Sequence, residues 1–326
     1  MQQQCRGYNV GAANSRPLKM FIIVERAAIS CPYVGVYQNM NGIVIVDKPS
    51  GWTSQDVTAK LRGVFQTRRI GHGGTLDPMA TGVLPVFVGR ATRGVEFFEH
   101  AEKTYETVLH LGFTTDTEDI SGTVLTQQDA FVTGEQVEKV LEKFRGEIMQ
   151  IPPMYSALKI NGQKLCDLAR KGKEVERKPR PVTIHELTLL SMEAEGIRLR
   201  VRCSKGTYIR TLCKDIGEAL GCGGCMAALR RVSAGAYTID EAVPLAELIE
   251  SDDPRKYLRG VDTMFAQYPA LTLTANQEKR CRNGNSFSVN MTDGTYRAYS
   301  QAGEFLMLAK VDAGIMSTVK SFFEVL

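Results

Sequence analysis

One carboxylate, Asp77, lies in a setting that would hold it still, and a held carboxylate can act as a nucleophile. It belongs to the stretch 71–82, which reads Gly-His-Gly-Gly-Thr-Leu-Asp-Pro-Met-Ala-Thr-Gly. The glycines allow backbone angles and close approaches that a side chain would forbid, and Pro78 disfavours a helical conformation at Asp77. An Asp-Pro pair among glycines is also typical of a simple turn. The residues alone leave both interpretations open.

The elements that must position this loop can be predicted from local patterns. Apolar runs rich in β-branched residues indicate buried strands, and strict alternation of apolar and polar residues indicates half-buried ones. Thr53 or Ser54 can cap a helix, and Thr133 with Gln136 forms a capping-box sequence. Arg210 would lie in the first turn of its helix, where the dipole alone favours an acid. The predicted strands are 41–46, 83–88, 103–112 and 196–203, and the predicted helices are 56–64, 133–146 and 209–220.

Charge is distributed unevenly along the 326 residues. The formal net charge is only +4. Between Ser156 and Arg210, however, 13 Lys and Arg residues face 6 Asp and Glu residues, so the rest of the chain is slightly acidic. A local basic segment suits a phosphate backbone, although a solvated charged face has the same composition.

Cysteine usage and hydropathy narrow the class of protein. The eight cysteines are scattered and lack the spacing of a secreted disulfide scaffold, so a reducing cytoplasm is expected. Cys222 and Cys225 form a single CxxC without a second ligand pair nearby, which argues against a zinc site. No apolar run approaches the ~18 residues that a membrane span needs. Residues 1–39 differ from the rest and are interpreted as a disordered extension or a segment upstream of the functional start.

Several motifs, in fixed order along the chain, resemble those of the TruB-type tRNA pseudouridine synthases. The resemblance is strong over residues 40–240 and loose over 268–326. It is carried by Lys-Pro-Ser-Gly-Trp-Thr-Ser at 48–54, Gly-Gly-Thr-Leu-Asp at 73–77, Lys-Thr-Tyr at 103–105, Thr-Asp-Thr-Glu-Asp at 115–119, Pro-Met-Tyr-Ser-Ala-Leu-Lys at 153–159, Lys-Gly-Thr-Tyr-Ile-Arg at 205–210 and Leu-Arg-Arg at 229–231.

The resemblance implies a fold and a domain organisation. We expect an α+β pseudouridine synthase fold, with a mixed, mainly antiparallel central sheet flanked by helices. This catalytic domain would span 40–267 and carry a basic thumb insertion at about 151–183. Short strand-like pieces separated by turn signals predict a small β-barrel domain over 268–326, which resembles a PUA RNA-binding domain.

The resemblance also implies roles for individual residues. Asp77 would be the nucleophile and Arg210 its ion-pair partner, which favours the charged form of the carboxylate. Tyr105 would stack on the target base and is the leading candidate to take up the C5 proton. His72 would fill space left in the RNA stack. The other residues expected to bind RNA or support the site are Lys48, Asp119, which would orient the arginine, Tyr208, and Leu229, which would line the uracil pocket.

The implied activity is isomerisation of uridine-55 in the T-loop of tRNA to pseudouridine. The reaction needs no cofactor and no metal. We expect the T-arm of tRNA to be the partner, with a monomeric protein in the cytoplasm, no obligatory protein partner and no membrane. Two alternatives remain: the guide-RNA-dependent branch of the same superfamily, and a non-catalytic RNA-binding or RNA-folding module.

Overall fold

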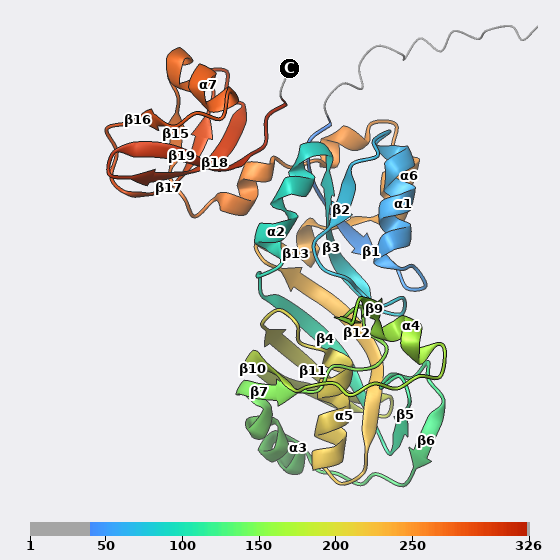
Figure 1. The fold of residues 1–326 in the computed structure, drawn as a ribbon. Helices are drawn as coiled ribbons and strands as arrows, with labels where there is room; N and C mark the ends of the chain where they lie inside the picture. Colours follow the sequence, from blue (N-terminus) through green and yellow to red (C-terminus); the bar gives the residue numbers. More distant parts are fainter. Residues whose placement is uncertain (1–39, 325–326) are drawn as a thin grey trace, which may run out of the picture. The chain divides into compact units, whose positions relative to one another are not determined.

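The computed structural model describes residues 40–324, so the interpretation of residues 1–39 lies outside the described residues. The main element is a ten-stranded sheet (Figure 1). Its strands are β1 (Gly42–Lys48), β2 (Ile70–His72), β3 (Thr81–Val88), β4 (Lys103–Leu111), β7 (Gly146–Gln150), β10 (Arg180–Glu193), β11 (Gly196–Cys203), β12 (Gly224–Ala234), β13 (Tyr237–Thr238) and β14 (Val243–Pro244).

The strand order of this sheet explains how distant motifs meet. It runs β14-β1-β3-β12-β4-β11-β10-β7, with β2 beside β3 and β13 beside β12. The pairs β1·β14 and β3·β12 are parallel, and the other pairs of this sheet are antiparallel. The mixed, mainly antiparallel sheet that the resemblance implied is therefore confirmed. It places β3, which follows the Asp77 loop, next to β12, which carries the Leu-Arg-Arg motif.

Helices accompany this sheet, and two of them begin at caps that the sequence predicted. Thr53 and Asp56 form a complete capping box at the start of α1, and Thr133 and Gln136 form another at α3. The helix expected over 133–146 is shorter, because α3 gives way to the 3₁₀ turn η2. The helices are α1 (Ser54–Val64), α2 (Val95–Phe98), α3 (Gly134–Leu141), α4 (Leu165–Ala169), α5 (Ile209–Ala219), α6 (Leu245–Glu250) and α7 (Ala275–Arg282), and the 3₁₀ turns are η1 (Gly89–Gly94), η2 (Glu142–Phe144), η3 (Ile239–Glu241), η4 (Pro254–Tyr257) and η5 (Val261–Phe265).

The core follows the predicted alternation. In β11 the side chains of Ile197, Leu199, Val201 and Cys203 are buried, while the arginines between them are exposed or half-buried. Strand β1 is buried almost throughout and reaches Lys48, two residues beyond the strand predicted from its apolar run. Burial of a charged residue at the end of a core strand is unusual. It indicates that Lys48 has specific polar partners inside the protein.

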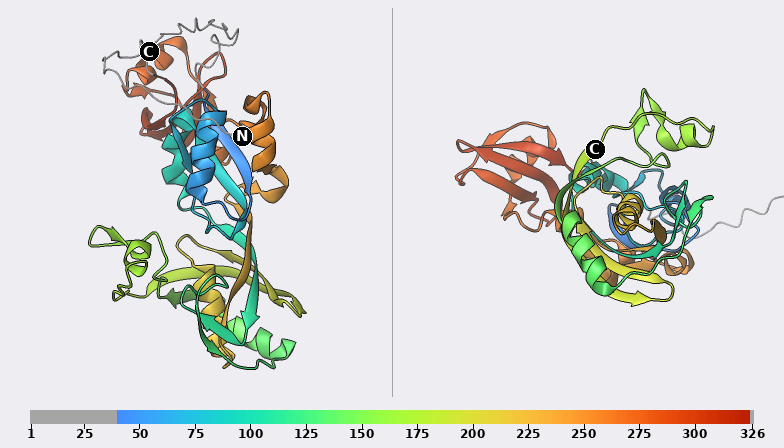
Figure 2. Two further views of the ribbon diagram at one scale, coloured as in Figure 1. Left: turned by 90° about the vertical axis from the view of Figure 1, so that its right-hand side faces the viewer. Right: turned by 90° about the horizontal axis from the view of Figure 1, so that it is seen from below.

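Two smaller units lie outside the large sheet. The segment 151–179 contains the two-residue strands β8 (Lys159–Ile160) and β9 (Gln163–Lys164) together with α4, and it stands out from the large sheet (Figure 2). Strand β10 begins at Arg180, inside the range expected for the thumb. A separate pair is formed by β5 (Phe113–Thr115) and β6 (Val124–Gln127).

A five-stranded sheet near the C-terminus matches the expected small β domain. Its order is β15-β17-β18-β19-β16, and α7 packs with it around a core of its own. The boundary expected at 267/268 remains a prediction. The strands are β15 (Ala270–Thr272), β16 (Phe287–Ser288), β17 (Gly294–Tyr299), β18 (Phe305–Asp312) and β19 (Ile315–Ser321).

Candidate active site

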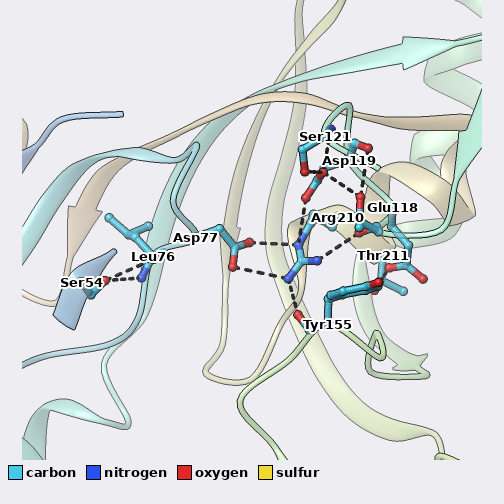
Figure 3. Close-up of polar contacts among 10 residues, drawn as sticks. Ser54, Leu76, Asp77, Glu118, Asp119, Ser121, Tyr155, Arg210 and Thr211 are labelled. Atoms are coloured by element: carbon cyan, nitrogen blue, oxygen red, sulfur yellow. Dashed lines mark hydrogen bonds and ion pairs between the residues drawn. The ribbon is translucent and has the colours of Figure 1, made fainter. Parts of the chain in front are cut away.

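The loop 73–80, which joins β2 to β3, is fastened to its surroundings by backbone groups. The Gly73 amide donates to the carbonyl of Pro85 at 2.8 Å, and the Leu76 amide donates to Oγ of Ser54 at 2.8 Å. The same Ser54 hydroxyl contacts the Leu76 carbonyl at 3.2 Å. Ser54 is the first residue of α1, so the helix start braces the loop directly before Asp77 (Figure 3). The loop therefore holds Asp77 as a fixed group.

Lys48 fastens the other side of the same loop. Its Nζ donates to the carbonyls of Pro49 at 2.8 Å, Trp52 at 2.7 Å and Pro78 at 3.2 Å. The residue has no exposed surface, and burial lowers the pKa of its ammonium to about 8, with the charge of Asp77 opposing that change. Lys48 thus joins the Lys-Pro-x-Gly-x-Thr-Ser loop to the residue that follows Asp77. This position is consistent with the supporting role expected for Lys48, which stays a prediction.

Asp77 and Arg210 form the ion pair at the centre of the site. Nε of Arg210 lies 2.9 Å from Oδ2 of Asp77, and Nη2 donates to Oδ1 at 3.4 Å. The arginine side chain is only 6% exposed, whereas the aspartate side chain is 34% exposed. The cation is therefore enclosed and the carboxylate is open to a ligand. This is the arrangement that a nucleophile requires, because it must stay ionised and yet be reachable.

Backbone carbonyls fix the remaining donors of Arg210. Nη1 donates to the carbonyl of Thr117 at 3.0 Å, and Nη2 donates to the carbonyl of Tyr155 at 2.8 Å. Arg210 lies in the first turn of α5, where its charge gains nothing from the helix dipole. Its partners come from the acidic turn and from the start of the thumb (Figure 3). Five donors in a planar fork suit this cage better than an ammonium would.

Asp119 shapes the acidic turn more directly than it holds the arginine. Its Oδ1 accepts from Oγ1 of Thr117 at 2.8 Å, and from the amide and hydroxyl of Ser121 at 2.9 and 2.5 Å. Its Oδ2 lies 3.9 Å from Nε of Arg210. The turn that Asp119 closes also presents the Thr117 carbonyl to Arg210. Its influence on the arginine thus runs largely through the backbone, and its role in catalysis stays a prediction.

Tyr105 and Leu229 come from the neighbouring strands β4 and β12. Tyr105 lies on β4 opposite Arg231 of β12, and Leu229 lies opposite Thr107. Leu229 belongs to the main core cluster, and Tyr105 is partly buried and packs against it. Burial raises the pKa of the Tyr105 phenol above its ordinary value, and the nearby charge of Asp77 adds to the rise. The phenol is therefore neutral near pH 7 in the free protein.

His72 and Tyr208 are the remaining residues to which the sequence assigned a role. His72 ends β2, and burial, followed by the charge of Arg231, lowers the pKa of its imidazole. Its Nδ1 is buried without a hydrogen-bond partner among residues 40–324. Tyr208 precedes α5, exchanges backbone hydrogen bonds with the Gln150 amide group, and has a phenol pKa raised by burial. Neither residue carries a charge near pH 7, which suits stacking and packing more than proton transfer.

The structure adds Arg231, to which the sequence had assigned no role. This residue is 1% exposed and is the largest of the fully buried side chains among residues 40–324. The sequence could have indicated its position, because Leu229 and Arg231 are two residues apart on one strand and therefore point to the same face of the sheet. Arginine is rarely buried without a partner. From the sequence alone, both arginines of the Leu-Arg-Arg motif would therefore be expected at the protein surface.

Neither a metal site nor a membrane-spanning helix is found in the part of the chain that the structure describes. Residues 40–324 contain no group of three or more His, Cys, Asp or Glu side chains that could hold a metal ion. Within the same residues, none of the helices has the length and apolar character required to span a membrane.

Comparisons with known proteins agree with the motifs. Residues 62–209 match the model of the TruB family pseudouridylate synthase N-terminal domain, and residues 210–266 match the model of the tRNA pseudouridylate synthase B C-terminal domain. A tRNA pseudouridine synthase B of Clostridium kluyveri is 41% identical over 273 residues, covering 82% of this chain and 94% of the relative. One of Dechloromonas aromatica is 46% identical over 255 residues, covering 78% and 85%.

Two solved structures with the same fold are chains of larger assemblies. A chain of an H/ACA ribonucleoprotein bound to a substrate RNA containing 2′-deoxyuridine aligns with a TM-score of 0.66 at 23% identity, covering 87% of this chain and 86% of the other. A chain of a Cbf5-Nop10-Gar1 complex aligns with a TM-score of 0.66 at 24% identity, covering 87% and 85%. At these identities the likeness shows a shared fold.

Proposed function

The chain belongs to the TruB family of pseudouridylate synthases, and from this premise we propose that it isomerises uridine-55 in the T-loop of tRNA, with Asp77 as nucleophile. The observation that carries the assignment of Asp77 is its ion pair with Arg210, in which the cation is enclosed and the carboxylate is reachable. The names of the relatives, tRNA pseudouridine synthase B, support tRNA as the substrate.

The reaction is an isomerisation, so its atoms balance without a co-reactant. The N1–C1′ bond breaks, the uracil rotates, the C5–C1′ bond forms, and the proton on C5 leaves while N1 gains one. Asp77 can serve by attacking C6, by attacking C1′, or by assisting abstraction at C2′. Each route uses the same carboxylate, which Arg210 orients at 2.9 Å.

The target base must leave its stack before it can reach Asp77. Extruding a base costs a few kcal/mol, and stacking on an aromatic ring returns about 1–3 kcal/mol. Tyr105 is the aromatic side chain that we assign to this stacking, with Leu229 beside it in the same cluster. Its neutral phenol is suited to stack on the base. To take up the C5 proton, the phenol must release its own hydroxyl proton in the same step. His72, also uncharged near pH 7, is assigned to the RNA around the extruded base.

The site is tested by replacing the nucleophile with its uncharged isostere. Asp77→Asn should abolish pseudouridine formation at base resolution on a tRNA transcript, while the tRNA dissociation constant changes by less than about threefold. A matched control exists in the surface pair of Asp253 and Arg255, whose Oδ1 and Nε lie 2.7 Å apart. Asp253→Asn should leave turnover unchanged. Equal turnover by Asp77→Asn would reject the catalytic assignment.

Substrate, assembly and compartment form part of the same proposal. We assign the protein to stand-alone action on the T-arm of tRNA in the cytoplasm, as a monomer without an obligatory protein partner. The rival is guide-dependent action inside a complex, because the solved neighbours are chains of assemblies. Activity of the purified chain on a bare tRNA transcript supports stand-alone action, whereas activity only with added guide RNA and proteins would reject it. Binding without turnover would indicate a non-catalytic RNA-binding module.

A further inference from the structure

Two consecutive arginines of β12 have opposite environments. Arg230 is 41% exposed at its side chain, and its guanidinium reaches both carboxylate oxygens of Asp47, at 2.8 and 3.2 Å. Arg231 is 1% exposed. It forms no ion pair within residues 40–324, and two of its nitrogens donate to backbone carbonyls. The first arginine is an ordinary partly exposed member of an ion pair, while the second is a buried charge that lacks a carboxylate.

The carbonyls that Arg231 contacts belong to the two ends of the catalytic loop. Its Nε donates to Val83 at 2.7 Å, and its Nη2 donates to Gly74 at 3.2 Å. Gly74 precedes Asp77 by three residues, and Val83 lies in β3, directly after the loop. One rigid guanidinium therefore spans the entry and the exit of the segment that carries Asp77. A planar fork can hold two acceptors at a fixed separation, which an ammonium cannot do.

Glycines at positions 74 and 82 allow the loop to pass close to Arg231. Gly74 has φ +93°, and a Cβ placed on it would lie 3.4 Å from Nη1 of Arg231. Gly82 has φ +100°, and a Cβ there would lie 2.2 Å from the Arg231 carbonyl oxygen. Such backbone angles and such close approach favour glycine. Both positions favour glycine through their positive φ, and at Gly82 the backbone of Arg231 also leaves no room for a side chain.

Arg231 also lies next to the strand that carries Tyr105. Tyr105 is the residue opposite Arg231 in the β4·β12 pairing. The charge of Arg231 opposes the rise in the pKa of Tyr105 that burial causes. Lys103, two residues earlier on β4, has a pKa lowered to about 8 by burial and then by Arg231. Burying an uncompensated charge among other cations destabilises a fold. We therefore expect the buried guanidinium of Arg231 to serve the function of the protein.

We propose that Arg231 is a positioning residue of the isomerisation, which holds the Asp77 loop and Tyr105 at a fixed separation on either side of the extruded uracil. The proposal rests on the function proposed above. Arg231 acts through these two groups and does not touch the base. Displacing a reacting group by about 1 Å can lower a rate about 10²-fold. Loss of Arg231 should therefore lower the rate of the bound complex and leave tRNA binding largely intact.

The neighbouring arginine supplies a matched control. Arg231→Lys and Arg230→Lys each retain the charge and lose the fork. We measure the single-turnover rate at saturating enzyme, the tRNA dissociation constant, and the circular dichroism spectrum at the assay temperature. The expected rate falls about 10²-fold for Arg231→Lys and less than about threefold for Arg230→Lys, with both dissociation constants within about threefold of the wild type.

A chemical rescue separates positioning from general support of the fold. Guanidinium at low millimolar concentration should restore part of the rate of Arg231→Ala by occupying the vacated site between the two carbonyls. It should not restore Arg230→Ala or Asp77→Asn. In the Tyr105→Phe background, Arg231→Lys should lower the rate less than it does alone, because the two residues lie opposite each other in the β4·β12 pairing and neighbouring residues are not energetically independent.

Each outcome decides between the two proposals. Wild-type protein that forms no pseudouridine refutes the proposed function. Wild-type activity with equal rates for Arg231→Lys and Arg230→Lys overturns the inference and leaves the function standing. An Arg231→Lys chain that does not fold, or a slow variant that guanidinium does not rescue, assigns Arg231 to the stability of the fold and also overturns it.

Discussion

Two loops of the molecule carry residues assigned to the substrate, and they are held in opposite ways. The catalytic loop, residues 73–80, is anchored by Ser54, Lys48 and Arg231 through its own backbone groups. The thumb, residues 151–179, contains two-residue strands and a five-residue helix, and its lysines at 171, 173 and 178 are exposed. Chemistry needs a group fixed to within a fraction of an ångström. Attraction of a phosphate backbone needs only accessible charge.

The two loops meet at the arginine of the site. The thumb begins close to Tyr155, whose carbonyl accepts from Nη2 of Arg210 at 2.8 Å. Farther along, the thumb bonds to itself, as in the hydrogen bond from the Leu165 amide to the Leu158 carbonyl at 2.8 Å. Arg177 differs from the exposed lysines, because its Nη1 donates to the Pro152 carbonyl at 3.2 Å. The thumb therefore contacts the active site near its first residues, and its exposed lysines lie farther along the segment.

The largest effect is expected at the point where both loops converge. Arg210→Lys keeps the charge but cannot reach Asp77, Thr117 and Tyr155 together, so the carboxylate loses its orientation. Misplacing a reacting group by about 1 Å can lower a rate about 10²-fold. Because Arg210→Lys also removes the second contact to the carboxylate, we expect the single-turnover rate to fall roughly 10³-fold. Arg255→Lys, in the surface pair with Asp253, is the control. A rate within about threefold of the wild type for Arg210→Lys would show that the ion pair is not what holds Asp77.

A smaller effect is expected from the thumb, and on a different quantity. Replacing the three exposed lysines 171, 173 and 178 by serine should weaken tRNA binding about 10-fold at low salt. A plot of the logarithm of the tRNA binding constant against the logarithm of the salt concentration should also become less steep. The slope should decrease by roughly 0.7–0.9 for each phosphate that the thumb no longer neutralises. The single-turnover rate at saturation should not change. The same replacement at Lys60, Lys139 and Lys143, on α1, α3 and η2, tests for a general charge effect. An unchanged slope would mean that the thumb lysines face solvent.

The smallest effect concerns the anchoring of the catalytic loop by Lys48. Its pKa in the folded protein, about 8, lies below the ordinary value of 10.5. Between these two pH values the folded chain has released a proton that the unfolded chain retains, so the contribution of Lys48 to stability rises with pH. The unfolding free energy of the wild type minus that of Lys48→Met should therefore increase from pH 7.5 to 9.5, by no more than about 1.4 kcal/mol per pH unit.

Urea titrations at the two pH values measure this difference. Lys60→Met, at an exposed position of α1, should show the same difference at both pH values. A difference for Lys48→Met that stays constant would mean that its ammonium remains solvated, and that the catalytic loop is less firmly held than its hydrogen bonds indicate.

Local preference explains what the sequence by itself determined. The features that the sequence determined depend on residues within a few positions of one another. They are the helix caps at Thr53 and Thr133, the alternation along β11, and the glycines and proline around Asp77. The family was recognised from motifs, and with it the pairing of Asp77 and Arg210. Composition and spacing alone left two interpretations of Asp77 open, a reactive group on a fixed loop or part of a simple turn.

Tertiary structure decided how the site is held. Asp77 and Arg210 are 133 residues apart, and only the folded sheet with α5 against it brings them to 2.9 Å. Three cations, Lys48, Arg210 and Arg231, are fixed by backbone carbonyls, and a carbonyl is the same at every residue, so the sequence does not reveal which ones accept. For that reason the consecutive arginines 230 and 231 look alike in the sequence, while in the fold one pairs with Asp47 in a partly exposed position and the other lies buried against the catalytic loop.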